Sequence, residues 1–379
     1  MKNKIRCLIC GMSSSIGGIE TYVITQFRAL NKDLFHYDFV FSHKEGDIAF
    51  GEEIAELGSK VYRITNSKQW KEFLLAHSGD YDLLIFNTPA PVFLPFINGK
   101  RFGNFKKIIV HSHNSRSDMP WYIKNFVPFS FKYVQLKMRY AKAEKWACSQ
   151  LAGRFMFGKA AEFTIIRNAI ELEKFRFSKS TRNIIRSLNN TSDNSFVIGL
   201  VGRFDYQKNH RFAIEIFRKY HEKNNNAELW LIGPESRKEL ADEIHRSVYA
   251  YGLSDSVKFF GALSNVNEYY QAMDVFILPS LFEGLPISGI EAQASGVPCL
   301  FSDTITRELV VNSDNVEYLS IDGADAASVW SNHIEDIAQN YDAYFQMREK
   351  AYLKVKEAGY DINAETRRVE KLFMDMCKG

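Results

Sequence analysis

Short apolar runs bounded by turn residues recur along the 379-residue sequence, separated by longer stretches with a helical pattern. The first five runs are Ile5–Cys10, Tyr37–Phe41, Leu83–Phe86, Lys107–Val110 and Thr164–Ile166. Five more are Phe196–Val201, Leu229–Ile232, Val257–Phe260, Val275–Leu278 and Pro298–Phe301. This alternation is typical of parallel strands joined by helices. It predicts an α/β protein built from doubly wound, Rossmann-like sheets.

A polar stretch, Glu171–Asn194, interrupts the alternation between the two sets of runs. A single core usually stops growing near about 250 to 300 residues, so this chain has room for two domains. We expect Rossmann-like domains at 1–171 and 195–360, a linker at 172–194 and a last helix at 361–379. Ligands of such sheets bind beyond the carboxyl ends of the strands, which places the expected site in a cleft between the two domains.

The composition is that of an ordinary globular protein, with 46% hydrophobic and 25% charged residues. A formal net charge of +3 gives no argument for nucleic acid as a partner. The five cysteines are scattered, and Cys7 and Cys10 would point to opposite faces of one strand, so we expect buried thiols. Because no secretory leader is visible and no apolar stretch approaches the roughly 20 residues that span a bilayer, we expect a cytoplasmic protein.

An acidic pair, Asp80 and Asp82, has a spacing that often holds a divalent metal. The pair precedes the strand Leu83–Phe86, so it lies at the end of the sheet opposite the expected site. We interpret it as a strand-entry turn. With no other clustered His or carboxylate ligands in the sequence, we expect neither a metal nor a cofactor.

A turn after the run Phe196–Val201 carries two cations. The strand ends at Gly202, and Arg203 and Lys208 flank the turn before a helix that starts near Asn209. Both side chains could reach one diphosphate and neutralise it. A solvated basic turn is the simpler explanation for this turn taken alone, so the interpretation depends on a second element.

That second element is the segment Ser280–Ile287, which follows another strand. Pro286 suits the first position of a helix, and Gly284 allows the backbone to approach a ligand closely. Glu283 stands just outside this helix and Glu291 lies about two turns along it, so the two carboxylates could bind hydroxyls at different depths. The alternative makes Glu283 a helix-dipole partner and Glu291 a surface residue, but the small residues around Glu291 indicate a packed helix.

Together, Glu283 and Glu291 resemble the E-x7-E motif of family 4 glycosyltransferases, which have the GT-B fold of two Rossmann-like domains facing each other across a cleft. Gly202, Arg203 and Lys208 resemble the diphosphate-binding residues of that family. Four further segments are similar to bacterial capsular and exopolysaccharide members: Gly17-Gly18-Ile19-Glu20, His111-Ser112-His113-Asn114, Ala147-Cys148-Ser149 and Arg167-Asn168-Ala169-Ile170.

The resemblance implies a retaining, metal-independent transfer of a sugar from a nucleotide diphosphate sugar, UDP-sugars among them. It implies a glycan acceptor, expected to be lipid-linked, in bacterial surface polysaccharide biosynthesis. It also implies a last helix that crosses back to the first domain. The implied donor contacts are Arg203 and Lys208 on the diphosphate, Glu283 on the sugar, Glu291 on the ribose, backbone at Gly202, Gly284, Leu285 and Pro286, and close approach at Gly17 and Gly18.

The family places a catalytic histidine after a strand of the first domain, and two histidines compete for that role here. His113, followed by Asn114 and Ser115, matches the pattern somewhat better than His111. Both follow the run Lys107–Val110, at the end of the sheet where the site is expected. Both therefore remain candidates.

The segment 119–146 interleaves aromatic residues with lysines and arginines. Such a surface suits anionic lipid headgroups, so we expect peripheral contact with the cytoplasmic face of the inner membrane, with a helix simply packed on the first domain as the alternative. Two other functions stay open for the chain. One is a sugar-nucleotide 2-epimerase, which would turn over without an acceptor, and the other is a catalytically silent binding subunit.

Overall fold

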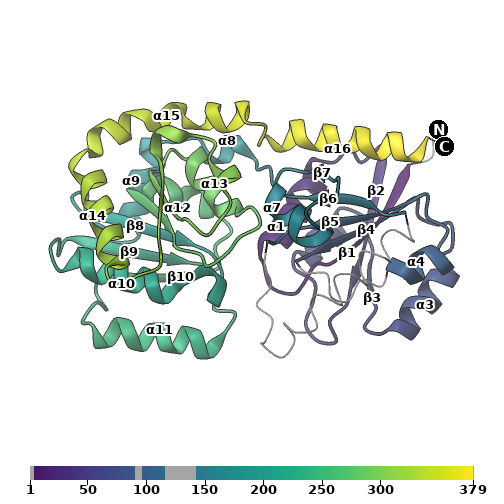
Figure 1. Ribbon diagram of the computed structural model, residues 1–379, viewed down its shortest axis with the longest axis horizontal. Coiled ribbons are helices and arrows are strands. Elements are labelled where there is room, and N and C mark those ends of the chain that lie inside the picture. The colour runs from purple at the N-terminus through teal and green to yellow at the C-terminus, as the bar shows by residue number, and fades with distance from the viewer. Residues whose placement is uncertain (1–3, 90–95, 116–141, 379) are drawn as a thin grey trace. The chain divides into compact units, whose positions relative to one another are not determined.

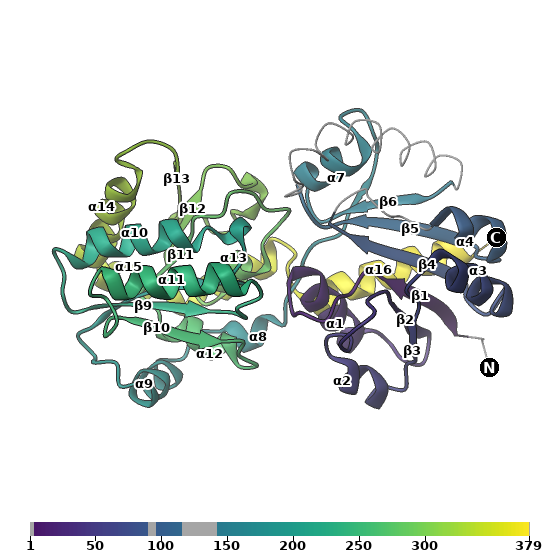
Figure 2. The same cartoon turned by 90° about the horizontal axis from the view of Figure 1, so that it is seen from below.

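The computed structural model describes residues 4–89, 96–115 and 142–378, and the chain divides into two compact units. The first unit comprises Met1–Asn168 and Ile362–Gly379, and the second comprises Ala169–Asp361 (Figure 1). Each unit contains one parallel β-sheet covered by helices (Figures 1 and 2). The predicted class, an α/β protein with doubly wound sheets, is confirmed.

In the first unit, seven described strands pair in the order β3-β2-β1-β4-β5-β6-β7. The strands are β1 (Ile5–Cys10), β2 (Phe35–Phe41), β3 (Val61–Arg63), β4 (Leu83–Thr88), β5 (Lys107–Ser112), β6 (Glu144–Ala147) and β7 (Thr164–Ile165). The helices are α1 (Gly18–Ala29), α2 (Gly51–Glu56), α3 (Ser67–Ala76), α4 (Phe96–Phe102), α7 (Gln150–Phe157) and α16 (Ile362–Cys377). The central strand β4 is buried along its whole length, which is why it stands out as an apolar run.

The strands β3 and β6 are absent from the sequence prediction. β3 has only three residues and is partly exposed, and β6 begins with Glu144 and Lys145. Both strands join the sheet through backbone hydrogen bonds, which need no apolar run. Cys7 and Cys10 lie in β1 as buried free thiols, as predicted.

The acidic pair before β4 joins the amino ends of neighbouring strands. An oxygen of Asp82 accepts the backbone N–H of Arg6 at 2.9 Å, and the other oxygen pairs with the Lys106 ammonium at 3.0 Å. The Asp80 carboxylate lies 2.9 Å from the Nδ1 of His77. The interpretation of this pair as a strand-entry turn is confirmed.

In the second unit, six described strands pair in the order β10-β9-β8-β11-β12-β13. The strands are β8 (Phe196–Val201), β9 (Ala227–Ile232), β10 (Val257–Gly261), β11 (Val275–Leu278), β12 (Cys299–Ser302) and β13 (Val316–Leu319). The helices are α8 (Leu172–Phe175), α9 (Lys179–Leu188), α10 (His210–His221), α11 (Lys238–Ala250), α12 (Val266–Ala272), α13 (Ile287–Ala294), α14 (Ala326–Gln339) and α15 (Tyr341–Glu357), with 3₁₀ turns at Tyr206–Lys208, Arg307–Leu309 and Ser313–Asn315. The four-residue strand β13 was not predicted.

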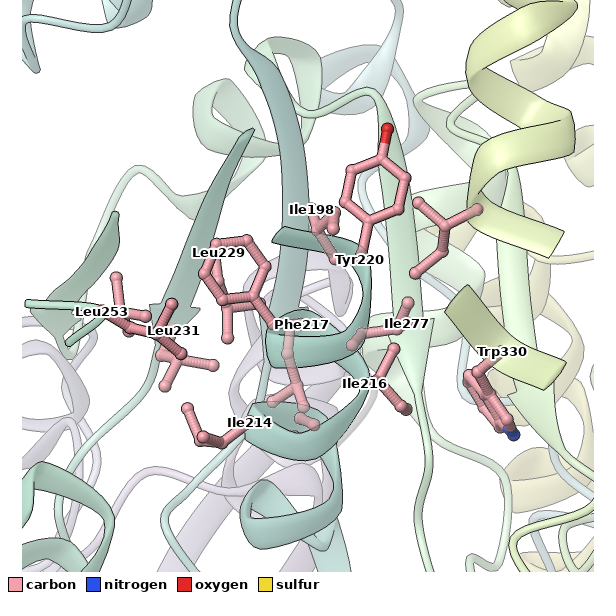
Figure 3. Close-up of a cluster of buried hydrophobic side chains, with 14 of the residues drawn as sticks. Ile198, Ile214, Ile216, Phe217, Tyr220, Leu229, Leu231, Leu253, Ile277 and Trp330 are labelled. Atoms are coloured by element: carbon pink, nitrogen blue, oxygen red, sulfur yellow. The ribbon is translucent and has the colours of Figure 1, made fainter. Parts of the chain in front are cut away.

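The core of the second unit forms where α10 packs on the sheet. Phe217 and Ile216 of α10 belong to the same buried cluster as Leu229 of β9 and Ile277 of β11 (Figure 3). Trp330 of α14 is fully buried in this cluster as well. Burying such side chains contributes roughly 1.5 to 3 kcal/mol each, so this layer fixes α10 and the turn before it.

The polar stretch expected to be a linker contains α8 and α9, and both belong to the second unit. Arg182 and Arg186 of α9 bind the buried carboxylate of Asp274 at 2.6 and 3.2 Å. Asp274 also accepts the backbone N–H of Val197 at 2.7 Å, which connects α9 to the start of β8. The arginines that give this stretch its polar composition are therefore buried.

The last helix, α16, packs in the first unit. Glu370 accepts the backbone N–H of Asn31 at 2.7 Å, and Glu365 accepts that of Arg167 at 2.8 Å. Phe373 is fully buried among aromatic rings of the first sheet, with ring centroids 5.6 Å from Trp146 and 6.0 Å from Phe35. Helix α16 therefore covers one face of that sheet.

Within the described ranges, the helices are all too short or too polar to cross a bilayer. Most of the aromatic and basic segment 119–146 lies outside the described residues, which resume at Lys142.

Candidate functional site

In the second unit, the turns after β8 and β11 lie at the same edge of the sheet, because these strands are parallel neighbours. The turn after β8 passes through Gly202 and the 3₁₀ turn Tyr206–Lys208, and Asn209 then takes a left-handed conformation with φ 54° before α10 begins. The side chain of Lys208 lies back over Gly202. A Cβ at Gly202 would stand 2.7 Å from Cε of Lys208, so a larger residue here would displace the flexible end of the Lys208 side chain.

Glu283, in the turn after β11, collects donors from both turns. The Lys208 ammonium and the Ser280 hydroxyl bind its Oε1 at 2.8 and 3.0 Å. The side-chain amide of Gln207 donates to its Oε2 at 2.8 Å. Glu283 is only 6% exposed, so this is a largely desolvated ion pair supported by neutral hydrogen bonds.

Glu291 lies on α13, buried near the same cation. It accepts a hydrogen bond from the Tyr270 hydroxyl at 2.9 Å. Burial raises the pKa of Glu291 to about 7, against the opposing effects of the Tyr270 hydrogen bond and the Lys208 charge. The structure therefore brings Glu283, Glu291 and Lys208 into one electrostatic cluster.

The other predicted residues of the second unit lie in the same two turns. Gly284, Leu285 and Pro286 are buried in the turn, and α13 begins at Ile287, so Pro286 takes the N-cap position rather than the first helical position expected for it. Arg203 is half-buried, and no hydrogen bond or ion pair joins its guanidinium to any residue of the described ranges.

Three residues of this cluster were not predicted. Gln207 stands next to the predicted Lys208, and Ser280 opens the segment Ser280–Ile287 that contains Glu283, so their position after a strand was a usable signal. Tyr270 comes from α12, and no sequence pattern places it on Glu291, because the contact depends on how α12 packs on α13.

In the first unit, α1 begins at Gly18 with Gly17 as its N-cap, so no side chain caps the first amides of the helix. A Cβ at Gly18 would meet nothing within 4 Å, so packing within the unit does not require this glycine. Glu20 in the first turn is buried and accepts the backbone N–H and hydroxyl of Ser13, both at 2.8 Å. These bonds fix the path of the turn before α1.

His111 and His113 lie side by side, with ring centroids 3.9 Å apart. His111 has no exposed surface, and neither of its ring nitrogens has a hydrogen-bond partner among the residues that the structure describes. His113 is half-buried, and its Nε2 lies 3.0 Å from the Oδ1 of Asn87, whose Nδ2 donates to the Cys10 carbonyl at 3.4 Å. Burial lowers the pKa of both histidines, that of His113 to about 3.

The family model for "Glycosyl transferases group 1" matches residues 181–354. The chain is 27% identical over 372 residues to EpsF of Bacillus subtilis (strain 168), which is classed with the glycosyltransferases, covering 95% of this chain and 93% of EpsF. It is 29% identical to a UDP-Gal:alpha-D-GlcNAc-diphosphoundecaprenol alpha-1,3-galactosyltransferase of Escherichia coli, over 40% of each chain. It is 25% identical to the capsular polysaccharide biosynthesis glycosyltransferase CapH of Staphylococcus aureus, over 48% of each.

Among solved structures, the chain resembles HepE of Anabaena in complex with UDP-glucose. The TM-score is 0.81 at 17% identity, and the match covers 98% of this chain and 100% of HepE. At this identity the likeness shows a shared fold.

Proposed function

The chain is a family 4 glycosyltransferase with the GT-B fold, related to enzymes of capsule and exopolysaccharide biosynthesis, and from this premise we propose that it transfers a sugar from a UDP-sugar to a lipid-linked glycan. The observation that carries the proposal is the cluster of Lys208, Glu283 and Glu291 at the carboxyl ends of β8 and β11. It combines a cation for a diphosphate with carboxylates for hydroxyl groups.

Loss of the diphosphate is the part of this reaction that most needs electrostatic help, because negative charge grows on the leaving oxygen. We assign Lys208 and Arg203 to that charge. The Arg203 guanidinium suits the role because it is not engaged by the described chain, and Lys208 because its ammonium is held in a largely desolvated position. Gly202 leaves room for the Lys208 side chain, and Gly284, Leu285 and Pro286 would present backbone to the donor.

In this proposal the two carboxylates bind different parts of the sugar donor. Glu283 would bind hydroxyls of the transferred sugar, and Glu291 those of the ribose. A hydrogen bond to a charged group contributes about 1.5 to 3 kcal/mol to the free energy of binding. Such bonds also give geometric specificity, and more of it where water is excluded from the site. Burial of both glutamates supports this assignment.

In the first unit we propose that His113, rather than His111, contacts substrate, since His111 has no exposed surface. A pKa of about 3 makes His113 a weak general base near neutral pH, so its role would be to hold a hydroxyl. Backbone at Gly17 and Gly18 would also approach substrate, as the open space at Gly18 allows.

The donor and acceptor are proposed from relatives. HepE was crystallised with UDP-glucose, and the E. coli relative uses UDP-Gal and a GlcNAc-diphosphoundecaprenol acceptor. We extend the UDP-sugar and the lipid-diphosphate-linked glycan to this chain. We also propose a retaining transfer with no metal in the chemical step, in surface polysaccharide synthesis.

The test is a transfer assay with UDP-glucose, UDP-galactose and UDP-N-acetylglucosamine against a lipid-diphosphate-linked saccharide, followed by NMR of the anomeric product. Transfer with retention supports the proposal. Turnover of the donor alone to a 2-epimer would replace it with the epimerase, and binding without turnover would replace it with a binding subunit. Lys208→Ala should cost mainly turnover and Glu291→Ala mainly donor affinity, while the exposed Lys238→Ala serves as the matched control.

A further inference from the structure

Gln207 connects the two turns of the candidate site. Its side-chain amide donates to the Oε2 of Glu283 at 2.8 Å and to the carbonyl of Phe282 at 3.0 Å. The backbone carbonyl of Gln207 accepts the backbone N–H of Leu281 at 2.8 Å. One residue of the β8 turn therefore binds three consecutive residues of the β11 turn.

The donors on Glu283 differ in what a diphosphate would do to them. Lys208 is a cation, so a bound diphosphate competes with Glu283 for its ammonium. Gln207 and Ser280 are neutral, so a diphosphate gives them no comparable reason to leave. If Lys208 were the sole donor, Glu283 would lose its anchor at the moment when the sugar must be recognised.

We propose that Gln207 is a positioning residue for the donor sugar, which holds Glu283 in place when Lys208 turns to the diphosphate. The inference rests on the proposed function, in which Glu283 binds the sugar. Gln207 and Ser280 hold one oxygen each, so release of the ammonium frees a lone pair of Oε1 for a sugar hydroxyl while the carboxylate keeps its orientation. Gln207 thereby determines how far the enzyme distinguishes a UDP-sugar from UDP.

The test compares binding of UDP with binding of UDP-glucose, UDP-galactose and UDP-N-acetylglucosamine by calorimetry. Gln207→Met keeps the length of the side chain but removes the donor. Gln339→Met, on the exposed end of α14, removes another Gln–Glu hydrogen bond as the control. We expect the UDP affinity of Gln207→Met to stay within about twofold and the UDP-sugar affinity to fall by roughly tenfold or more, as loss of a hydrogen bond to a charged group predicts.

A double-mutant cycle then separates positioning from general damage. In a Glu283→Ala background, Gln207→Met should change UDP-sugar affinity by less than about twofold, because Gln207 acts through Glu283. The inference is overturned if Gln207→Met weakens the binding of UDP and of UDP-sugar equally, so that the ratio of their affinities is unchanged. It is also overturned if the effects of Gln207→Met and Glu283→Ala on UDP-sugar binding are fully additive.

Gln207→Glu supplies a second readout and a second variant in case the first does not fold. The new carboxylate would face Glu283 at hydrogen-bond distance, so UDP-sugar binding should weaken relative to UDP at pH 8 and recover as the pair takes up one proton at lower pH. The ratio of UDP-sugar affinity to UDP affinity is the quantity to follow, because pH effects on binding of the ribose and the diphosphate cancel in it. A ratio independent of pH overturns the inference, whereas a wild type that binds none of the four nucleotides overturns the proposed function, and the inference with it.

Discussion

The hydroxyl of Tyr270 donates to a carboxylate oxygen of Glu291 at 2.9 Å, and both side chains are buried in the second unit. The contact joins α12 to α13. Burial raises the pKa of Glu291 to about 7, and the Tyr270 hydrogen bond limits that rise. The ionisation of Glu291 therefore changes near neutral pH, where the protein can be studied.

The first prediction concerns the pH dependence of donor binding. Glu291 is ionised above its pKa, so UDP should bind tightest near pH 8 and weaken by up to about tenfold per pH unit below about 7. The measurement is calorimetric titration with UDP between pH 5.5 and about 8.5. Glu291→Gln is the control, because it keeps the pH effects of the phosphate and removes that of the carboxyl.

Tyr270→Phe extends this prediction. Loss of the hydroxyl should raise the pKa of Glu291 further, since the hydrogen bond favours the charged form. The midpoint of UDP binding should move up by about one pH unit. An unmoved midpoint would show that Tyr270 does not act on the carboxylate.

The second prediction concerns stability. The pKa of Glu291 rises from 4.5 to about 7 on folding, so the folded state binds more protons and stability falls as pH rises between these values. Glu291→Gln removes this effect. The variant should be more stable than the wild type by about 1 to 3 kcal/mol at pH 8 and nearly equal to it at pH 5, in urea unfolding without ligand. A variant less stable than wild type at pH 8 would contradict the burial cost.

The third prediction separates the two histidines. His113→Ala should lower kcat by roughly 100-fold, because the variant loses the half-buried ring that Asn87 orients. His111→Leu should leave kcat within about threefold and keep or raise the melting temperature, since it removes two buried nitrogens that no described residue hydrogen-bonds. The reverse pattern in transfer assays would assign the catalytic role to His111.

The fourth prediction uses a pair of glycines. Gly202→Ala places a methyl group against the flexible end of Lys208, so turnover should fall by about tenfold or more with a stability change below about 1 kcal/mol. Gly233→Ala places its methyl group 2.2 Å from the Gly202 carbonyl at φ +147°, so it should destabilise the fold by about 2 kcal/mol or more. Unfolding and kinetic measurements on both variants check the contrast.

Much of this architecture follows from local sequence. Buried parallel strands such as β4 are marked by an apolar run, here Leu83–Phe86, and the turns after β8 and β11 carry the candidate site residues next to those strands. The strands β3, β6 and β13 are only three or four residues long and include charged or exposed residues such as Glu144 and Glu317, so no apolar run marked them.

The stretch expected as a linker shows a different limit. Its serines, asparagines and arginines are typical of exposed chain, yet Arg182 and Arg186 are buried on Asp274, which lies far along the sequence. From sequence alone a charged residue is expected to be exposed, because its buried partner cannot be identified. The same holds for Tyr270 and Glu291, whose meeting depends on helix packing.

The first unit is assembled from both ends of the sequence, because its last helix, α16, follows the whole second unit. During synthesis the second unit leaves the ribosome before α16 has been made. Throughout that interval Phe35, Tyr37 and Trp146 lack the ring of Phe373 that covers them. Of the two units, the one whose synthesis starts earlier is thus the later to complete its core, and its uncovered aromatic side chains are prone to aggregation until α16 packs on them.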